Sequence, residues 1–241
     1  MKFRLLGVLL LASPFLARAD LTIVQKVEGG GPVSDVTVEI KGTKSRIQAG
    51  GTATIVDAQS GEAVTILTAE RKIVRLSADK AKAAADMIAK FSGTKAAPEK
   101  PKLVATGRKE NVNGMATEVF TANTQLGMAT YYVAANYPDG AAILEQMQQM
   151  QPGAFASAAN FMPDYREFHG IPVRTEIDIM GQHIVTNLTA IKRDPIAESE
   201  FAVPQGYEEV KIPNLLSGKM SNVPSPGSAP RPSQTPSPKK P

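Results

Sequence analysis

The sequence predicts a mainly β fold of the α+β class, a curved antiparallel half-barrel of about eleven strands with two or three helices packed against its inner face. Short segments in which apolar and polar residues alternate fill most of the chain, and this period of two is typical of strands with one buried face. Clusters of Gly, Pro and Asn separate these segments as turns do. Only two longer segments place apolar residues at helical spacing. Because so many antiparallel strands curl into a barrel or a sandwich, the simplest packing wraps the sheet around the helices.

The composition of the 241 residues excludes several kinds of functional site. With 42% hydrophobic and 21% charged residues, the chain can build a core and is not globally disordered. The absence of Cys excludes disulfides, thiol nucleophiles and cysteine-ligated metals. Two His are too few for a multi-histidine metal site, and the sequence has no phosphate-binding loop or dinucleotide fingerprint. We therefore expect no metal, no cofactor and no catalytic residue.

Residues 1–19 have the pattern of a secretory signal peptide. A basic start is followed by an apolar run and then by the tripeptide Ala17-Arg18-Ala19, which predicts cleavage before Asp20. The apolar run is shorter than the roughly 20 residues that a membrane-spanning helix needs. No Cys follows the run, so a lipid-anchored product is not expected. We expect a soluble periplasmic or secreted protein.

The net charge of +4 is concentrated at the two ends of the chain. Residues 214–241 form a basic tail rich in Pro and Ser, which we expect to be disordered. Without this tail and the signal peptide, the domain at 20–213 has a net charge of −3. A nucleic-acid partner is therefore not expected, and the basic cluster around Lys44 is expected to be a solvated strand end. The tail could make a weak contact with a membrane surface or a cell-wall polymer.

The first half of the domain contains six expected strands and one expected helix. The strands are expected at 20–28, 35–41, 44–48, 52–57, 63–68 and 72–77. Residues 78–92 follow, with an apolar face at helical spacing that includes Phe91. Ser77 is a suitable N-cap for this helix. We expect the helix to lie on the sheet.

The second half of the domain contains further strands around a second helix. Strands are expected at 103–109, 115–121 and 127–135, and a helix is expected over about 141–151. The last hairpin is the clearest, because apolar and charged residues alternate on both sides of Gly181-Gln182, which fits a two-residue turn. The resulting register pairs Ile179 with Ile184 and gives the hairpin one apolar face.

Two short segments resemble a known family. The residues at 107–114 (GRKENVNG) and 200–207 (EFAVPQGY) are similar to an exported bacterial family of domains of unknown function. The order of strands and helices resembles that of the LolA-like superfamily of periplasmic lipoprotein carriers. This resemblance extends over residues 20–213 and implies a half-open antiparallel barrel whose helices close one side over an apolar cavity. Proteins of that superfamily carry acyl chains. No ligand-contacting motif of the superfamily matches this sequence position by position, so no site residue is transferred.

The polar residues that could act in catalysis are not placed by the sequence beside the nucleophile or base that catalysis would need. His169 and His183 are not placed beside a nucleophile or a base, and both are expected at the surface. Glu176 and Asp178 share one strand face, which is expected to be solvated rather than catalytic. An enzymatic function is therefore not expected.

The candidate binding residues are apolar. Met147 and Met150 lie three residues apart on the second helix, a spacing that suits a thioether copper site but also a core or cavity stripe, which is the stronger interpretation. Together with Ile143 and Phe91, they are the candidate lining of a ligand cavity. The resulting hypothesis is an exported, non-enzymatic binding or carrier protein for an apolar small molecule such as a lipid or acyl chain. The alternative is a structural or envelope-interaction protein without a ligand cavity. The oligomeric state is not predicted by any of these patterns.

Overall fold

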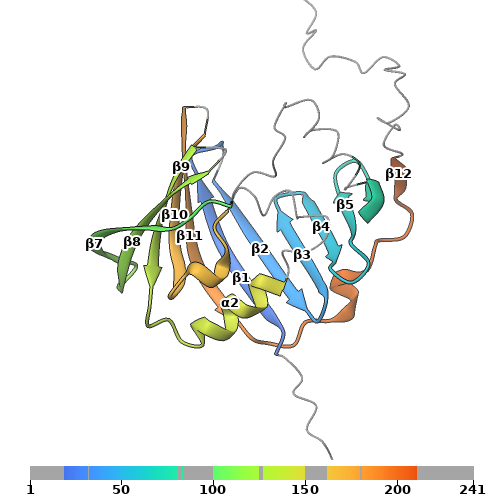
Figure 1. Cartoon of the computed structure of the whole chain (residues 1–241). Helices are drawn as coiled ribbons and strands as arrows, with labels where there is room; N and C mark the ends of the chain where they lie inside the picture. The colour runs from blue at the N-terminus through green and yellow to red at the C-terminus, as the bar shows by residue number, and fades with distance from the viewer. Residues whose placement is uncertain are drawn as a thin grey trace, which may run out of the picture. The chain divides into compact units, whose positions relative to one another are not determined.

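Twelve strands form a single sheet within the residues that the computed structural model describes, which are 19–31, 33–80, 83, 100–124, 127–149, 162–179 and 181–210 (Figure 1). The strands are β1 (Leu21–Glu28), β2 (Ser34–Lys41), β3 (Lys44–Ala49), β4 (Thr52–Asp57), β5 (Glu62–Leu67), β6 (Lys72–Leu76), β7 (Val104–Val112), β8 (Met115–Thr124), β9 (Gly127–Ala134), β10 (Ile171–Ile179), β11 (Gln182–Lys192) and β12 (Glu208–Val210).

The sheet joins two meanders through its central strand. From edge to edge the order is β12-β6-β5-β4-β3-β2-β1-β11-β10-β9-β8-β7. β1 therefore pairs with β2 of the first meander and with β11 of the second, antiparallel in both cases. The predicted class, a curved antiparallel sheet with helices on its inner side, is confirmed.

The pairing of β12 departs from the expected all-antiparallel sheet. β12 pairs parallel with β6, and Glu208 lies beside Lys72 at the first position of each strand. The chain that precedes β12 packs on β3 to β6 after β11 ends. Because this segment brings the chain to the start of β6 rather than to its end, the two strands run in the same direction.

Side chains alternate between two faces of the sheet. We call the inner face the one that carries Leu21 and Ile23 of β1 and their partners Ile40 and Val38 of β2. These residues pack in one core cluster with Ile143 of α2 (Gly140–Gln149). The opposite side, which carries residues such as Glu39, is the outer face.

Two short helical segments complete the inner core. α2 begins at Gly140, one residue before the start predicted from the sequence, and it contacts η2 (Tyr165–Glu167) and β10.

The helix expected at 78–92 begins as predicted, because residues 78–80 are helical and the backbone N–H of Lys80 donates to Ser77 Oγ across 3.4 Å. Most of that helix, including Phe91, lies outside the described residues.

Residues 193–210, which we call the C-terminal strap, pack on the outer face. Phe201, at the end of η3 (Glu198–Phe201), and Ile196 are buried against apolar side chains of β4, β5 and β6. The described structure therefore has a second, smaller core on the side of the sheet opposite α2, and its buried members are Ala53, Ile55, Val64, Ile66, Ile73, Ile196 and Phe201.

The register of the last hairpin differs from the prediction by two residues. Ile179 pairs with Gln182 and Ile177 with Ile184, so Gln182 belongs to the strand rather than to the turn. Gly181 has a φ of 80°, which glycine adopts without strain at the second position of such a turn. A shift of two residues leaves every side chain on its original face, so the predicted apolar face persists.

Candidate functional site

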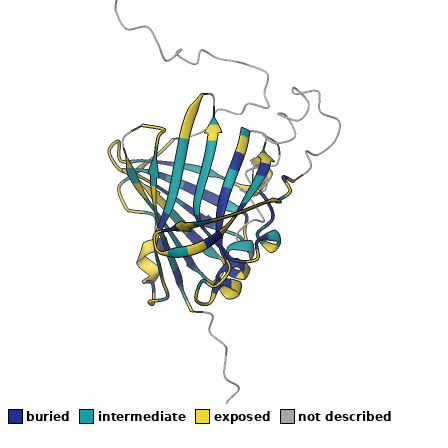
Figure 2. Ribbon diagram, turned by 90° about the vertical axis from the view of Figure 1, so that its left-hand side faces the viewer, coloured by how far each residue is buried: buried dark blue, intermediate teal, exposed yellow. Residues whose placement is uncertain are grey.

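The inner face has two ends that differ in burial. At the end near α2, inner-face residues are at most 6% exposed, and we call this the closed end, defined by Leu21, Ile23, Ile40, Val173 and Leu188. Further along the same strands the inner-face residues are only half-buried, and we call this the open end, defined by Val27, Val36, Ile47, Thr54, Thr65, Leu67, Thr175, Ile177, Ile184 and Thr186. Figure 2 shows the same change along the strands, from dark blue near α2 to teal and yellow at the opposite end.

α2 fills the closed end, and aromatic residues extend the same core along β9, where Tyr131 pairs with Thr175. Ile143 is 1% exposed and packs in the core cluster with the strand residues. The Tyr131 and Phe168 rings meet edge to face with their centroids 5.3 Å apart, an arrangement that aromatic pairs favour. Burial raises the pKa of Tyr131 to about 12, so this side chain is neutral at physiological pH. The closed end is therefore a packed core.

An ion-paired turn holds η2 against this core. Asp164 caps η2, accepting from the backbone N–H, Nε and Nη2 of Arg166 at 2.6–3.0 Å, and it also pairs with Lys100 at 3.4 Å. The Arg166 side chain, more than any other contact, holds the pKa of this 10%-exposed carboxyl well below its ordinary value. One residue beyond Arg166, Glu167 accepts from the backbone N–H of Leu103 at 3.1 Å. These contacts fix the segment that carries Phe168.

The open end stays apolar although its side chains are no longer fully buried. Most of its residues are Val, Ile and Leu, interspersed with Thr, and the half-buried Gln25 lies among them as the partner of Val36. The hydroxyls of Thr54 and Thr65 are 3.2 Å apart across β4 and β5, so these two polar atoms form a hydrogen bond with each other on the inner face. Thr175 and Thr186 are likewise directly opposite each other on β10 and β11. A half-buried apolar surface of this kind can bind apolar ligands by removing its own area from water.

The four site residues predicted from the sequence occupy different positions. Ile143 belongs to the packed closed end. Met147 is half-buried and packs against the same cluster one helical turn further along α2. Phe91 and Met150 lie outside the described residues. The strand residues of the open end were not predicted as site residues, although their alternation had placed them on one sheet face.

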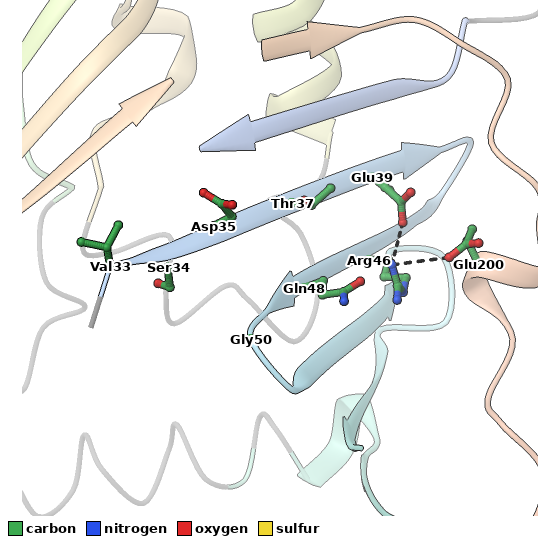
Figure 3. Close-up of a pocket in the computed structure, with 9 residues that line it drawn as sticks. All are labelled: Val33, Ser34, Asp35, Thr37, Glu39, Arg46, Gln48, Gly50 and Glu200. Atoms are coloured by element: carbon green, nitrogen blue, oxygen red, sulfur yellow. Dashed lines mark hydrogen bonds and ion pairs between the residues drawn. The ribbon is translucent and has the colours of Figure 1, made fainter. Parts of the chain in front are cut away.

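A polar depression of about 640 Å³ lies on the outer face (Figure 3). Asp35, Thr37 and Gln48 line it, and Arg46 at one end is within 3.0 Å of Glu39 and 3.5 Å of Glu200. Because two carboxylates already surround the guanidinium, this depression does not present a free cation to an anionic ligand.

The cations of this region hold the C-terminal strap. Lys41 pairs with Glu198 at 3.4 Å and donates to the backbone carbonyl of Ile196 at 2.5 Å, and Lys44 lies 3.8 Å from Glu198. The cluster was expected to be a solvated strand end, and this was wrong, because Asp20 and Glu39 pair with it and Glu198 and Glu200 reach it from about 150 residues further along the chain. The same strap contains the EFAVPQGY segment, whose Phe201 is buried and whose Tyr207 lies under the guanidinium of Arg71 at 5.8 Å.

The polar groups considered for catalysis lie at the surface. His169 is exposed, and His183 pairs with Asp178 at 2.9 Å, with both side chains more than half exposed. Glu176 lies 3.2 Å from Arg174 on the outer face. No group of three or more His, Cys, Asp or Glu side chains among the described residues is arranged to hold a metal ion.

The family described as a domain of unknown function (DUF4412) matches residues 32–207, and the chain belongs to it. This confirms the resemblance noted in the sequence. No curated protein matches the chain. In the part of the chain that the structure describes, no helix is long and apolar enough to span a membrane.

Several solved structures are similar to this chain at low identity. A LolA superfamily protein from Nitrosomonas europaea is 10% identical, with a TM-score of 0.30 and coverage of 77% of this chain and 90% of that one. The lipoprotein LppX from Mycobacterium tuberculosis is 12% identical, with a TM-score of 0.37 and coverage of 74% and 88%.

A structure of PNGF-II is 10% identical, with a TM-score of 0.39, and covers 82% of this chain. The chain spans about a third of the length of that protein, 32%. At these TM-scores the similarities do not bear on function.

Proposed function

We propose that this chain is an exported, non-enzymatic binding or carrier protein that holds an apolar ligand, such as a lipid or acyl chain, on the open end of the inner face. In this proposal the protein acts in the periplasm or outside the cell, after cleavage before Asp20. The ligand would pack on the half-buried apolar side chains of β1 to β5, β10 and β11. Met147 would form the boundary between ligand and core, with Ile143 packed below it and with Phe91 and Met150 as further lining residues.

The observation that carries this proposal is that the inner face remains apolar where its burial decreases. The outer face of the same strands behaves differently, because its exposed positions carry charged or amide side chains such as Lys26, Asp35 and Gln48. A sheet face that only meets water is expected to be polar, as this outer face is. Contiguous apolar surface that is left partly exposed is typical of interaction sites.

Two neighbouring positions on β3 provide a matched test. Ile47 is half-buried on the inner face, and Gln48 is the next residue, exposed on the outer face. The proposal expects wild-type protein to bind the fluorescent apolar probe Nile red with saturation. It expects Ile47→Asp to weaken this binding at least about tenfold, because a carboxylate would be desolvated under the probe. Gln48→Asp, which introduces the same charge on the other face, should bind as wild type does.

Thermal melts of the three proteins complete the experiment. An open binding surface tolerates Ile47→Asp with a loss of stability of about 1 kcal/mol, because the carboxylate stays hydrated without ligand. If wild type does not bind the probe and Ile47→Asp is unfolded, the inner face is solid core throughout. The proposal would then be rejected in favour of a structural or envelope-interaction protein without a ligand cavity.

A further inference from the structure

We infer that the ligand is an anionic amphiphile whose chain lies on the open end and whose carboxylate or phosphate pairs with Lys72. This inference rests on the proposed function and specifies its ligand class. It follows from where the structure places charge on the inner face and from which cations are already paired.

Lys72 is on the inner face at the open end of β6. It pairs with Leu67 of β5, and Val74 and Leu76 follow it on the same face. The inner-face positions of β1 to β6, β10 and β11 are otherwise uncharged. Within these strands the apolar face therefore ends at one cation.

No carboxylate among the residues that the structure describes lies within 4.0 Å of the Lys72 ammonium group, so Lys72 has no ion pair there. The other cations on strands β2 to β6 are held, because Lys41, Lys44, Arg46 and Arg75 each have a carboxylate partner. Arg71, in the turn before β6, lies over the Tyr207 ring instead. Lys72 is nevertheless half-buried, whereas the unpaired Lys192 is exposed. Glu208 neighbours Lys72 in the parallel pairing of β12 with β6, but it forms no ion pair with it and is exposed.

The registers of the strands give the path of the chain. The inner-face row that starts at Lys72 continues through Leu67, Thr52, Ala49 and Val36 on successive strands. The next row towards the closed end consists of Val74, Thr65, Thr54, Ile47 and Val38. Since strands are spaced by about 4.8 Å, these rows give an apolar path of about 19 Å from β6 to β2. An acyl chain that crosses the strands can follow this path from a head group at Lys72.

A head group at this position would be recognised by charge. An ammonium beside apolar surface forms a stronger ion pair than one in bulk water, because the effective dielectric constant is lower. Hydrogen bonds between charged partners are shorter and stronger than those between neutral ones. Lys72 would therefore add much more affinity for a carboxylate or phosphate than for a neutral head group.

The test compares dodecanoate with 1-dodecanol as competitors for bound Nile red, at concentrations below aggregation and at neutral pH. Wild type should prefer dodecanoate by about tenfold, which is the size expected for one charged hydrogen-bonded contact. Lys72→Met keeps the apolar stem and should remove this preference while leaving the affinity for 1-dodecanol unchanged. Lys192→Met removes an unpaired cation from the outer face and should keep the preference.

A competition experiment with inorganic phosphate tests whether the site binds any small anion rather than an anionic amphiphile. If phosphate alone at millimolar concentration displaced dodecanoate but not 1-dodecanol, and bound in a manner dependent on Lys72, the site would be an anion site and the amphiphile inference would be overturned. Equal affinity of wild type for the two dodecyl compounds would overturn the role of Lys72 and leave the proposed carrier function standing. Failure of both compounds to displace Nile red, or failure of Nile red to bind, would instead reject the proposed function.

Discussion

The closed and open ends of the inner face are built from the same strands and similar residues, but they have different surroundings. Leu21 and Ile23 begin β1 at 0% and 4% exposure, while Val27 near its other end is half-buried. On β10, Val173 is 0% exposed and Ile177 is half-buried. The difference shows that the strand pattern alone does not decide whether an apolar side chain is core or binding surface. On β1 and β10, what decides it is whether α2, η2 and their aromatic neighbours pack over it.

The largest expected difference between the two ends is in stability. Ile143→Ala removes a buried side chain from the closed end and should lower the free energy of unfolding by about 3–4 kcal/mol. Ile47→Ala at the open end should cost about 1 kcal/mol, because its side chain is only half-buried. Chemical denaturation of both variants measures the contrast. Equal losses would mean that the open end is packed as tightly as the closed end.

The second prediction separates stability from binding. Phe201→Ala removes the main buried side chain of the strap from the outer core and should destabilise the protein by about 3 kcal/mol. Because Phe201 packs on the face opposite the ligand, probe affinity measured well below the melting temperature should be unchanged. Loss of affinity in this folded variant would show that the two faces are coupled.

A third, smaller effect concerns the turn that completes the closed end. Asp164→Asn removes the charge that holds Arg166 and Lys100 and should cost about 2 kcal/mol at neutral pH. The pKa of Asp164 is depressed in the folded state, so its contribution is present above the ordinary value of 3.8 and is lost as pH falls below it. Wild type and Asp164→Asn should therefore converge in stability as the pH is lowered from 4 to 2.

In the fourth prediction, the rim of the open end contributes almost nothing to stability. His183 Nδ1 lies 2.9 Å from a carboxylate oxygen of Asp178, but their side chains are 56% and 70% exposed. His183→Gln should change the free energy of unfolding by less than about 0.5 kcal/mol, as is usual for exposed pairs. A thermal melt that shows a much larger loss would mean that this hairpin end is packed against something rather than open.

The sequence was sufficient to predict most of the strands, because each lies between short turn segments and alternates with a clear period of two. β1 to β6 and α2 fall within a few residues of their predicted bounds. For the last hairpin, the prediction assigned each side chain to the correct face of the sheet but paired the strands in the wrong register. Alternation determines the face, whereas the turn geometry selects among registers that differ by two residues.

The position of the C-terminal strap could not be predicted from local patterns. Its ion pairs join Lys41 to Glu198 and Arg46 to Glu200, and no local periodicity reports a contact over such separations. The division of the inner face into a closed and an open end also could not be predicted from the sequence, because it depends on where α2 and η2 pack. For the same reason Ile143 and Met147 were grouped together in the sequence, although the structure places Ile143 in the solid core.

The most direct measurement of the central claim is photolabelling with a diazirine-bearing fatty acid, followed by peptide mapping. The account predicts that label is incorporated at open-end residues of β1 to β5 and of the β10–β11 hairpin, such as Val36, Ile47 and Ile177. An excess of dodecanoate should suppress this labelling. Labelling that dodecanoate does not suppress, or that maps to the strap and the outer face, would contradict the account.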